Sequence, residues 1–319
     1  MTQAAAHSSA SSAADVIVVG AGPAGSSAAY HMATLGLDVI LLEKQELGRD
    51  KVCGDGLTPS AVRELVSMGM DTTGWQRNRG LRVIGGGHLL HFPWPEQASF
   101  PSYGMARPRA LLDRDLAEHA AAAGARLLTG VTVTAPVTSP TGRVTGVEAR
   151  PTNRVAYPGI EGPTTFTAPL VIDAGGVSAR LATAVGRTKN ERRPMGVAVR
   201  AYFRSPRAQD VWMESRLELW DGAPGKSDLL PGYGWIWSVG EGLVNVGLGS
   251  VSSRAQATAI DYRAVFNRWM DNVPASWGFT KENQVGGLVS AALPMAFNRK
   301  PHYADGLMLL GDAGGMVSP

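Results

Sequence analysis

The chain has 319 residues, and 44% of them are hydrophobic, which is enough to bury a large core in more than one lobe. The net charge of +3 is small and the basic residues are scattered, so the composition argues against nucleic-acid binding. The single cysteine, Cys53, excludes an internal disulfide, and the sequence has no apolar run of about eighteen residues that would span a membrane.

Neither a metal site nor a signal peptide is expected. Among the six histidines only His88 and His91 are close in sequence, and their spacing on a predicted strand places them on opposite faces. Residues 1–14 are rich in alanine and serine and lack a basic start and an apolar run, which predicts a disordered tail. We expect a cytoplasmic protein, and a weak attraction to an anionic membrane surface stays open.

The first half of the chain alternates strands and helices. A strand over 15–20, a helix over 23–36 and a buried strand over 38–43 form a βαβ unit. A longer helix over 108–123 is stopped by Gly124. The other predicted elements are a glycine-rich loop at 50–58, a helix from residue 59, a strand pair over 81–94, strands at 126–128, 131–134, 143–149 and 170–173, and a loop over 151–165.

From about residue 194 the pattern changes to the alternation that is typical of antiparallel sheets. The predicted elements are strands at 196–204, 216–220, 233–239 and 243–249, a helix at 259–272 and a last buried strand at 307–310. The order of elements predicts an α/β dinucleotide-binding domain that is interrupted by a β-rich domain.

A glycine-rich turn joins the first strand to the first helix. Its sequence, Gly20-Ala21-Gly22-Pro23-Ala24-Gly25, has the G-x-G-x-x-G pattern. Gly20 allows the tight turn, Gly22 lets the backbone approach a pyrophosphate, and Gly25 permits close helix packing. Glu43 follows the second strand, where a carboxylate binds ribose hydroxyls. The pattern predicts a dinucleotide site but does not distinguish NAD from FAD.

A second strand and turn of this kind lie near the end of the sequence, at Leu309 to Gly315. Asp312 in this turn is placed to accept hydrogen bonds from sugar-like hydroxyls, next to a helix N-terminus that favours phosphate. The segment Ile172-Asp173-Ala174-Gly175-Gly176 is similar. Together with the first motif, these turns favour FAD, because its ribityl chain needs such a partner.

Two further segments have both a structural and a functional interpretation. Cys53 lies in the glycine-rich run Lys51 to Pro59, either as a buried apolar filler or in a flavin-facing loop, and composition does not decide between them. Alternation places Tyr233, Trp235 and Trp237 on one face of a strand. By itself this stripe favours core packing over the wall of a substrate pocket.

Together and in this order, these segments resemble the geranylgeranyl reductase family of FAD-dependent oxidoreductases, within the group shared with aromatic hydroxylases. The likeness is carried by Gly20 to Gly25, Cys53 to Gly56, Tyr233 to Trp237 and Gly311-Asp312, and it runs from about residue 15 to the end. It is closest to the menaquinone reductases of actinobacteria, which saturate one isoprene unit of the menaquinone tail.

The resemblance implies an aromatic-hydroxylase-like fold, in which a Rossmann-like FAD-binding domain is interrupted by an antiparallel β-sheet substrate domain. The first domain would comprise residues 15–80, 106–190 and 295–319, and the second residues 81–105 and 191–294. The FAD-binding residues that it implies are Gly20, Gly22, Pro23, Ala24, Gly25, Glu43, Lys44, Cys53, Gly54, Arg107, Val133, Asp173, Gly311 and Asp312.

The implied reaction is the reduction of an isoprenoid C=C bond, in which FAD supplies the redox chemistry and Cys53 acts as proton donor or gate. Tyr233 and Trp235 would lie along the path of the tail. The implied partners are menaquinone as lipid substrate, the inner face of the cell membrane, and an unidentified electron donor, either NAD(P)H or a ferredoxin-like protein. A geranylgeranyl-lipid reductase, an FAD-dependent monooxygenase or halogenase, and an inactive isoprenoid-binding fragment stay open as alternatives.

The sequence departs from the family pattern in two places. Where the family continues Tyr-x-Trp-x-Phe-Pro, this chain has Trp237-Ser238, which puts the shape of the pocket in question. Family members also continue beyond the position of Pro319 with a phosphate-facing helix, so we expect a C-terminally shortened version.

Overall fold

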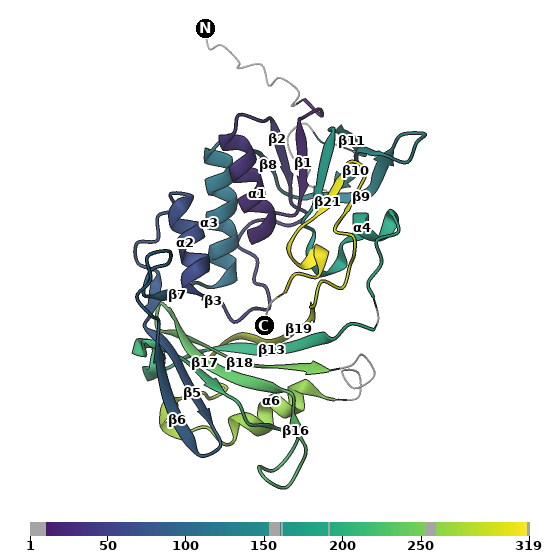
Figure 1. Ribbon diagram of the computed structural model, residues 1–319. Helices are drawn as coiled ribbons and strands as arrows, with labels where there is room; N and C mark the ends of the chain where they lie inside the picture. The colour runs from purple at the N-terminus through teal and green to yellow at the C-terminus, as the bar shows by residue number, and fades with distance from the viewer. Residues whose placement is uncertain (1–10, 153–159, 161, 191, 253–259, 318–319) are drawn as a thin grey trace. The chain divides into compact units, whose positions relative to one another are not determined.

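The computed structural model describes residues 11–152, 160, 162–190, 192–252 and 260–317 (Figure 1). The chain forms two compact units. Unit 1 comprises Met1–Arg49, Asp113–Asn190 and Phe297–Met316, and unit 2 comprises Asp50–Leu112, Glu191–Ala296 and Val317–Pro319. Residues 50–80, which we expected in the FAD-binding domain, therefore lie in unit 2.

Unit 1 is built on a six-stranded sheet with the order β20-β21-β12-β1-β2-β8. Its strands are β1 (Val16–Val19), β2 (Val39–Leu42), β8 (Arg126–Leu128), β12 (Leu170–Asp173), β20 (Tyr303–Ala304) and β21 (Leu307–Leu309). All neighbours are parallel except β20 and β21. This parallel order with a βαβ start confirms the Rossmann-like prediction.

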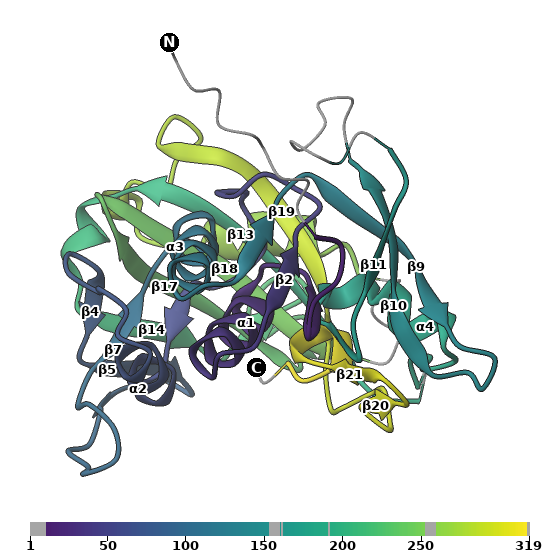
Figure 2. The same ribbon diagram turned by 90° about the horizontal axis from the view of Figure 1, so that it is seen from above.

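Different elements cover the two faces of this sheet. On one face lie α1 (Pro23–Thr34) and α3 (Arg109–Ala122), which are neighbours in Figure 2. The ring of Tyr30 on α1 stacks on that of His119 on α3, with 4.7 Å between the ring centroids. On the other face, a three-stranded antiparallel sheet contributes Val147 and Phe166 to a core that includes Ile17 of β1. Its strands are β9 (Val131–Thr138), β10 (Val144–Pro151) and β11 (Thr164–Thr167).

Local sequence sets the ends of these helices. Pro23 stands in the first turn of α1, where its missing N–H is not needed. Gly36 and Gly124, with φ of +83° and +111°, follow α1 and α3 in the left-handed conformation that glycine adopts readily. The remaining turns and helices of unit 1 are α4 (Arg180–Ala184), η1 (Gly176–Ser178) and η4 (Gly311–Gly314).

The end of the predicted N-terminal tail is partly ordered. Residues 1–10 lie outside the described part of the chain. Ser12 and Ala14, in contrast, hydrogen-bond through their backbones to Thr167 at 2.9 and 3.0 Å. Composition alone does not predict this pairing, because it depends on the exposed backbone of a neighbouring strand.

Unit 2 contains a seven-stranded sheet with the order β19-β13-β18-β17-β14-β5-β6. Its strands are β5 (Gly80–Gly85), β6 (His88–Pro93), β13 (Met195–Arg204), β14 (Trp212–Arg216), β17 (Gly232–Gly240), β18 (Leu243–Ser252) and β19 (Gln284–Pro294). Neighbours are antiparallel except β14 and β5. The antiparallel β-sheet prediction for this region is therefore confirmed.

Two strands of this sheet differ from the predictions. β19 was not predicted, because Gly286 and Gly287 interrupt its sequence and glycine is depleted in strands. The strand expected over 216–220 is instead the end of β14 followed by the separate β15 (Leu219–Trp220), which pairs with β16 (Leu229–Leu230).

Smaller elements flank the large sheet of unit 2. A three-stranded sheet has the order β3-β7-β4. The bounds are β3 (Gly56–Leu57), β4 (Gln76–Asn78), β7 (Gly104–Ala106), α2 (Pro59–Ser67), α6 (Tyr262–Met270), η2 (Pro206–Gln209) and η3 (Ala275–Trp277). Val265 and Phe266 of α6 pack with Ile236 of β17 in one core cluster. Alternation along β17 sends Trp235 and Trp237 into a different cluster on the opposite face.

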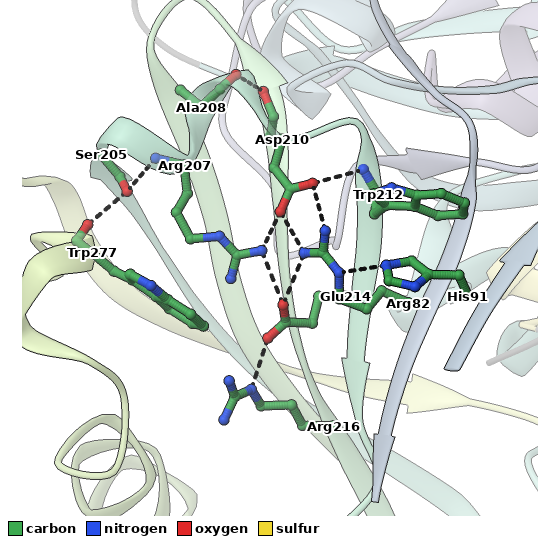
Figure 3. Close-up of polar contacts among 11 residues, drawn as sticks. Arg82, His91, Ser205, Arg207, Ala208, Asp210, Trp212, Glu214, Arg216 and Trp277 are labelled. Atoms are coloured by element: carbon green, nitrogen blue, oxygen red, sulfur yellow. Dashed lines mark hydrogen bonds and ion pairs between the residues drawn. The ribbon is translucent and has the colours of Figure 1, made fainter. Parts of the chain in front are cut away.

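A cluster of charged side chains ties β5, η2 and β14 together (Figure 3). Glu214 is only 2% exposed and pairs with Arg216 at 2.8 Å, Arg207 at 2.9 Å and Arg82 at 3.2 Å. Asp210 pairs with Arg82 at 2.6 Å and also with Arg207. Burial raises the pKa of Glu214, but the Arg207 and Arg216 charges outweigh it and leave the pKa below its ordinary value. The cluster is therefore an ionised network that holds three elements of the fold.

Among the described residues, no helix combines the length and the apolar character needed to cross a membrane.

Candidate functional site

The glycine-rich turn of unit 1 leaves no room for side chains. A Cβ atom at Gly25 would lie 1.9 Å from the carbonyl oxygen of Gly20. One at Gly20 would lie 2.5 Å from the carbonyl oxygen of Ala174, and Gly20 has a φ of +102°. The backbones of β1, β12 and the first turn of α1 therefore approach one another as the dinucleotide pattern requires.

The N-terminus of α1 is suited to an anion. Gly22 is the N-cap residue, and within the described part of the chain no side chain caps the helix and no acidic residue stands in its first turn. The first N–H groups of a helix have no partner inside the helix and carry a partial positive charge. Gly22 and Pro23 therefore open a helix end that fits a pyrophosphate.

Glu43 lies at the end of β2, beside this turn. It is 8% exposed, and its Oε2 accepts a hydrogen bond from the backbone N–H of Ala21 at 3.0 Å. Its Oε1 accepts one from the N–H of Gln45 at 3.0 Å. Each carboxylate oxygen has a further lone pair, so the same group fits ribose hydroxyls. Lys44, the next residue, is exposed.

The turn that contains Gly311 packs against the first turn of α1. A Cβ atom at Gly311 would lie 2.9 Å from the Cβ of Ala24. Asp312 follows in the η4 turn and is half-buried. Two motifs that are about 290 residues apart in sequence are thus adjacent in unit 1.

The side chains of Asp173 and Val133 face the interior of unit 1. Asp173 is 1% exposed, and its two oxygens accept hydrogen bonds from the N–H groups of Gly175 at 2.9 Å and Ala182 at 3.0 Å. Val133 belongs to the core that includes Ile17. Both side chains stabilise the fold, so any contact of these residues with FAD would have to use backbone atoms.

These residues of unit 1 fit FAD. The open end of α1 suits the pyrophosphate, Glu43 suits the ribose, and the Gly311-Asp312 turn suits the ribityl chain. A bound FAD would supply two-electron redox chemistry, which amino-acid side chains alone do not provide.

The loop that contains Cys53 lies on the sheet face of unit 2 that carries the tryptophans. Cys53 is half-buried, and its Sγ accepts a hydrogen bond from the N–H of Asp55 at 3.3 Å. Its carbonyl accepts one from Nδ2 of Asn245 at 2.9 Å. Burial raises the pKa of the Cys53 thiol, against the opposing effect of the Arg109 guanidinium. The thiol is therefore protonated at neutral pH, which suits a proton donor.

Asp55 is buried beneath this loop with a φ of +63°. Its Oδ2 accepts hydrogen bonds from the Tyr202 hydroxyl at 2.5 Å and from Nδ2 of Asn245 at 2.8 Å. Its Oδ1 accepts one from the N–H of Arg109 at 3.1 Å. Burial raises the pKa of Asp55 to about 6, although the hydrogen bonds from Tyr202 and Asn245 lower it.

The aromatic stripe of β17 is present as predicted. The ring centroids of Tyr233 and Trp235 are 6.1 Å apart, and those of Trp235 and Trp237 are 5.9 Å apart. The two tryptophans are 5% and 8% exposed, so they are largely core residues. Tyr233 is less buried, and burial followed by the nearby Cys53 raises its pKa. Tyr233 is therefore the member of the stripe best placed to meet a ligand.

The indole groups of the stripe fasten the Cys53 loop to the sheet. Nε1 of Trp237 donates a hydrogen bond to the carbonyl of Gly54 at 2.6 Å. Nε1 of Trp235 donates one to Oδ1 of Asn245 at 2.8 Å. Because phenylalanine has no such donor, this contact gives a physical reason for tryptophan at position 237, where the family pattern has Phe.

Arg107 is joined to the same loop. Its backbone N–H donates a hydrogen bond to the carbonyl of Asp55 at 3.1 Å, and its guanidinium lies 5.1 Å from the centre of the Trp75 ring. The structure thus groups Cys53, Gly54, Arg107 and Trp235 within unit 2, and the glycine-turn residues within unit 1.

Sequence reasoning missed the buried partners of this loop. Asp55, Tyr202 and Asn245 come from a loop and two strands, and no local pattern links them. The one available signal was an aspartate between Gly54 and Gly56, since Asp tolerates the left-handed conformation that such a turn requires. The structure describes no cluster of three or more His, Cys, Asp or Glu side chains suited to a metal ion.

Comparisons with known proteins agree with this geometry. The sequence profile of the FAD binding domain family matches residues 13–274. The chain is 38% identical to the menaquinone reductase of Mycolicibacterium smegmatis over 310 residues, which is 96% of this chain and 71% of that protein. It is 30% identical to a digeranylgeranylglycerophospholipid reductase of Methanopyrus kandleri over 96% of this chain and 71% of that protein.

Solved structures share the fold. A geranylgeranyl bacteriochlorophyll reductase-like protein from Thermoplasma acidophilum gives a TM-score of 0.75 at 24% identity, over 95% of this chain and 72% of that one. A myxobacterial chondrochloren halogenase, an FAD-dependent enzyme, gives a TM-score of 0.72 at 22% identity, over 96% of this chain and 70% of that one. The family profile and the curated relatives together show that this chain belongs to the FAD-binding family, as an FAD-dependent oxidoreductase related to these reductases.

Proposed function

We propose that this protein reduces one C=C bond in an isoprenoid chain, with the tail of menaquinone as its substrate. The observation that carries the proposal is the 38% identity to menaquinone reductase over 96% of the chain. The protonated Cys53 thiol beside Tyr233 supports it, because addition of hydrogen to an alkene needs a proton as well as a hydride.

The protein's own part in this reaction is to bind the tail, exclude water and deliver a proton. A bound, reduced FAD would supply the hydride chemistry, and the thiol of Cys53 would give its proton to an alkene carbon. Two electrons and two hydrogens are thereby added, and the thiolate regains its proton from solvent. Tyr233, the least buried member of the aromatic stripe, presents an aromatic surface that suits a tail without polar groups, and the buried Trp235 packs behind it.

Mass spectrometry of quinones tests this function directly. The gene is expressed in a menaquinone-producing host that makes no saturated tail, and the quinones are extracted. We expect menaquinone whose mass has increased by two hydrogen atoms. The Gly22→Val variant is the matched control, because its side chain would occupy the position of the pyrophosphate.

Three results would each favour one of the alternative functions. Saturation of geranylgeranyl lipids instead of menaquinone would favour a geranylgeranyl-lipid reductase, in line with the Methanopyrus kandleri relative. Substrate-stimulated oxygen uptake with NAD(P)H would favour a monooxygenase or halogenase, and a purified protein without flavin would favour an isoprenoid-binding fragment.

We also propose that the protein works on a membrane surface, because its substrate is a lipid. The edge strand β6 presents Leu89, Leu90 and Phe92 at 50% exposure or more, and exposed apolar side chains can rest on lipid. Co-sedimentation with vesicles of anionic phospholipid tests this, with Leu90→Ser/Phe92→Ser as the variant expected to bind less. NAD(P)H and a reduced ferredoxin-like protein are the two donors to compare in the turnover assay.

A further inference from the structure

A buried polar network surrounds Asp55, directly behind the cysteine. Asp55 is 1% exposed, yet its carboxylate receives hydrogen bonds from three elements of unit 2: Tyr202 on β13, Asn245 on β18 and the first residue of α3, Arg109. Its own N–H donates to Sγ of Cys53. One residue therefore joins the thiol to the sheet and to a helix.

The network also fixes the peptide that follows Cys53. Asn245 donates from Nδ2 to the carbonyl of Cys53 at 2.9 Å as well as to Asp55. Gly54 has no room for a side chain, since a Cβ there would lie 2.8 Å from Cζ2 of Trp237. The thiol is thus attached to a backbone segment, Cys53 to Asp55, that is held in place by hydrogen bonds and close packing.

Burial alone does not explain why a carboxylate stands here. An aspartate with φ of +63° adopts a left-handed conformation that is unfavourable for a residue with a side chain. Burying a charged group adds a further cost. An asparagine would fit the same turn with no charge, but it could accept hydrogen bonds at only one of the two positions where Asp55 accepts them. Asp55 thus combines an unfavourable backbone conformation with a buried charge. Such a residue is expected where its charge serves function.

We propose that Asp55 is a positioning residue for the reaction at Cys53: its backbone N–H holds the sulfur, and Tyr202 and Asn245 anchor its carboxylate next to the thiol loop. This inference rests on the proposed function insofar as Cys53 is the proton donor. The charge of Asp55 raises the pKa of Cys53, whereas the Arg109 charge and the N–H of Asp55 lower it.

Other ionisable groups lie around this pair. Arg200, on β13, is 1% exposed, lies 4.1 Å from the centre of the Tyr202 ring and pairs with Asp50 of the loop. Its charge lowers the pKa of Asp55. Tyr233 faces the thiol from β17. Because Asp55 titrates near pH 6, it is ionised wherever the thiol titrates, and it then acts on the thiol as a fixed negative charge.

The test uses the fact that Cys53 is the only cysteine in the chain. The rate of alkylation by iodoacetamide, followed by intact mass against pH, therefore reports the pKa of this thiol alone. The variants are Asp55→Asn, which keeps the N–H and tolerates the left-handed turn, and Asp55→Gly, which adopts that turn without strain. Asp71→Asn is the charge control, since Asp71 lies on the surface of unit 2.

We expect both Asp55 variants to lower the pKa of Cys53, with a several-fold faster alkylation at neutral pH, and Asp71→Asn to leave it unchanged. The loss of turnover at high pH should move to lower pH in Asp55→Asn. An unchanged thiol pKa in both folded variants would overturn the proposal, and so would unfolding of both, because Asp55 would then serve the fold only. Failure of the unmodified protein to reduce any isoprenoid would instead refute the proposed function and leave the thiol measurement intact.

Discussion

Replacing Cys53 by serine separates a catalytic thiol from a packing residue. Sγ of Cys53 accepts a hydrogen bond from the N–H of Asp55 at 3.3 Å, and a serine hydroxyl can accept the same bond. The residue as a whole is half-buried rather than fully enclosed. The substitution therefore keeps shape and hydrogen bonding and changes mainly the acidity of the group.

The expected magnitudes differ for stability and for turnover. A polar group that is buried without a partner costs about 1–3 kcal/mol, but the bond from Asp55 and the partial exposure should keep the loss below about 1 kcal/mol. In a protein of this size that corresponds to a fall in Tm of about 2–4 °C at most. Loss of a general acid typically lowers the rate by about 10²–10⁴-fold.

The assay measures turnover per bound flavin together with Tm. Thr58→Ser is the matched control, because Thr58 is exposed at the start of α2 and its substitution also leaves a hydroxyl. We expect normal flavin content, a small change in Tm and a steep loss of turnover in Cys53→Ser alone. Unchanged turnover with a large fall in Tm would refute the reasoning and make Cys53 a packing residue.

Three further predictions concern the cofactor, the ion network and pH. Gly22→Val should abolish FAD binding and Glu43→Ala should weaken it less, as measured by flavin absorbance of the purified protein, since Glu43 contacts only the ribose. Glu214→Gln should lower the free energy of unfolding by about 1–3 kcal/mol, because Arg216 loses its carboxylate partner while Arg82 and Arg207 keep Asp210. Asp221→Asn at an exposed pair should cost under about 1 kcal/mol, and urea denaturation measures both. The pKa of Asp55 is raised from 3.8 to about 6, so the stabilisation from the protonated carboxyl is complete below pH 3.8 and is lost as pH rises through about 6. Relative to Asp55→Asn, the free energy of unfolding of the unmodified protein should fall by about 3 kcal/mol between about pH 4 and pH 7.5. Parallel curves of stability against pH for the two proteins would contradict this.

The candidate FAD-binding residues of unit 1 could be predicted from the sequence because their determinants are local. Gly20, Gly22 and Gly25 act within one turn, and Glu43 follows the next strand, so a short stretch of sequence contains the whole geometry. Val133 and Asp173 belong to the same prediction, but their side chains turn inward. Spacing along a strand gives the residue and does not give the atom that faces a ligand.

The surroundings of Cys53 in unit 2 could be predicted only in part, because their determinants are distant in sequence. Cys53 and the β17 stripe are visible as motifs, yet what joins them is a set of hydrogen bonds from Tyr202 and Asn245 to Asp55. Those partners become neighbours only through the register of β13 with β18, which pairs Tyr202 with Asn245 directly. A one-residue shift in that register would turn one of the two side chains to the opposite face and leave the Asp55 carboxylate without that partner. The chemistry at Cys53 therefore depends on sheet pairing that no single segment of the sequence encodes.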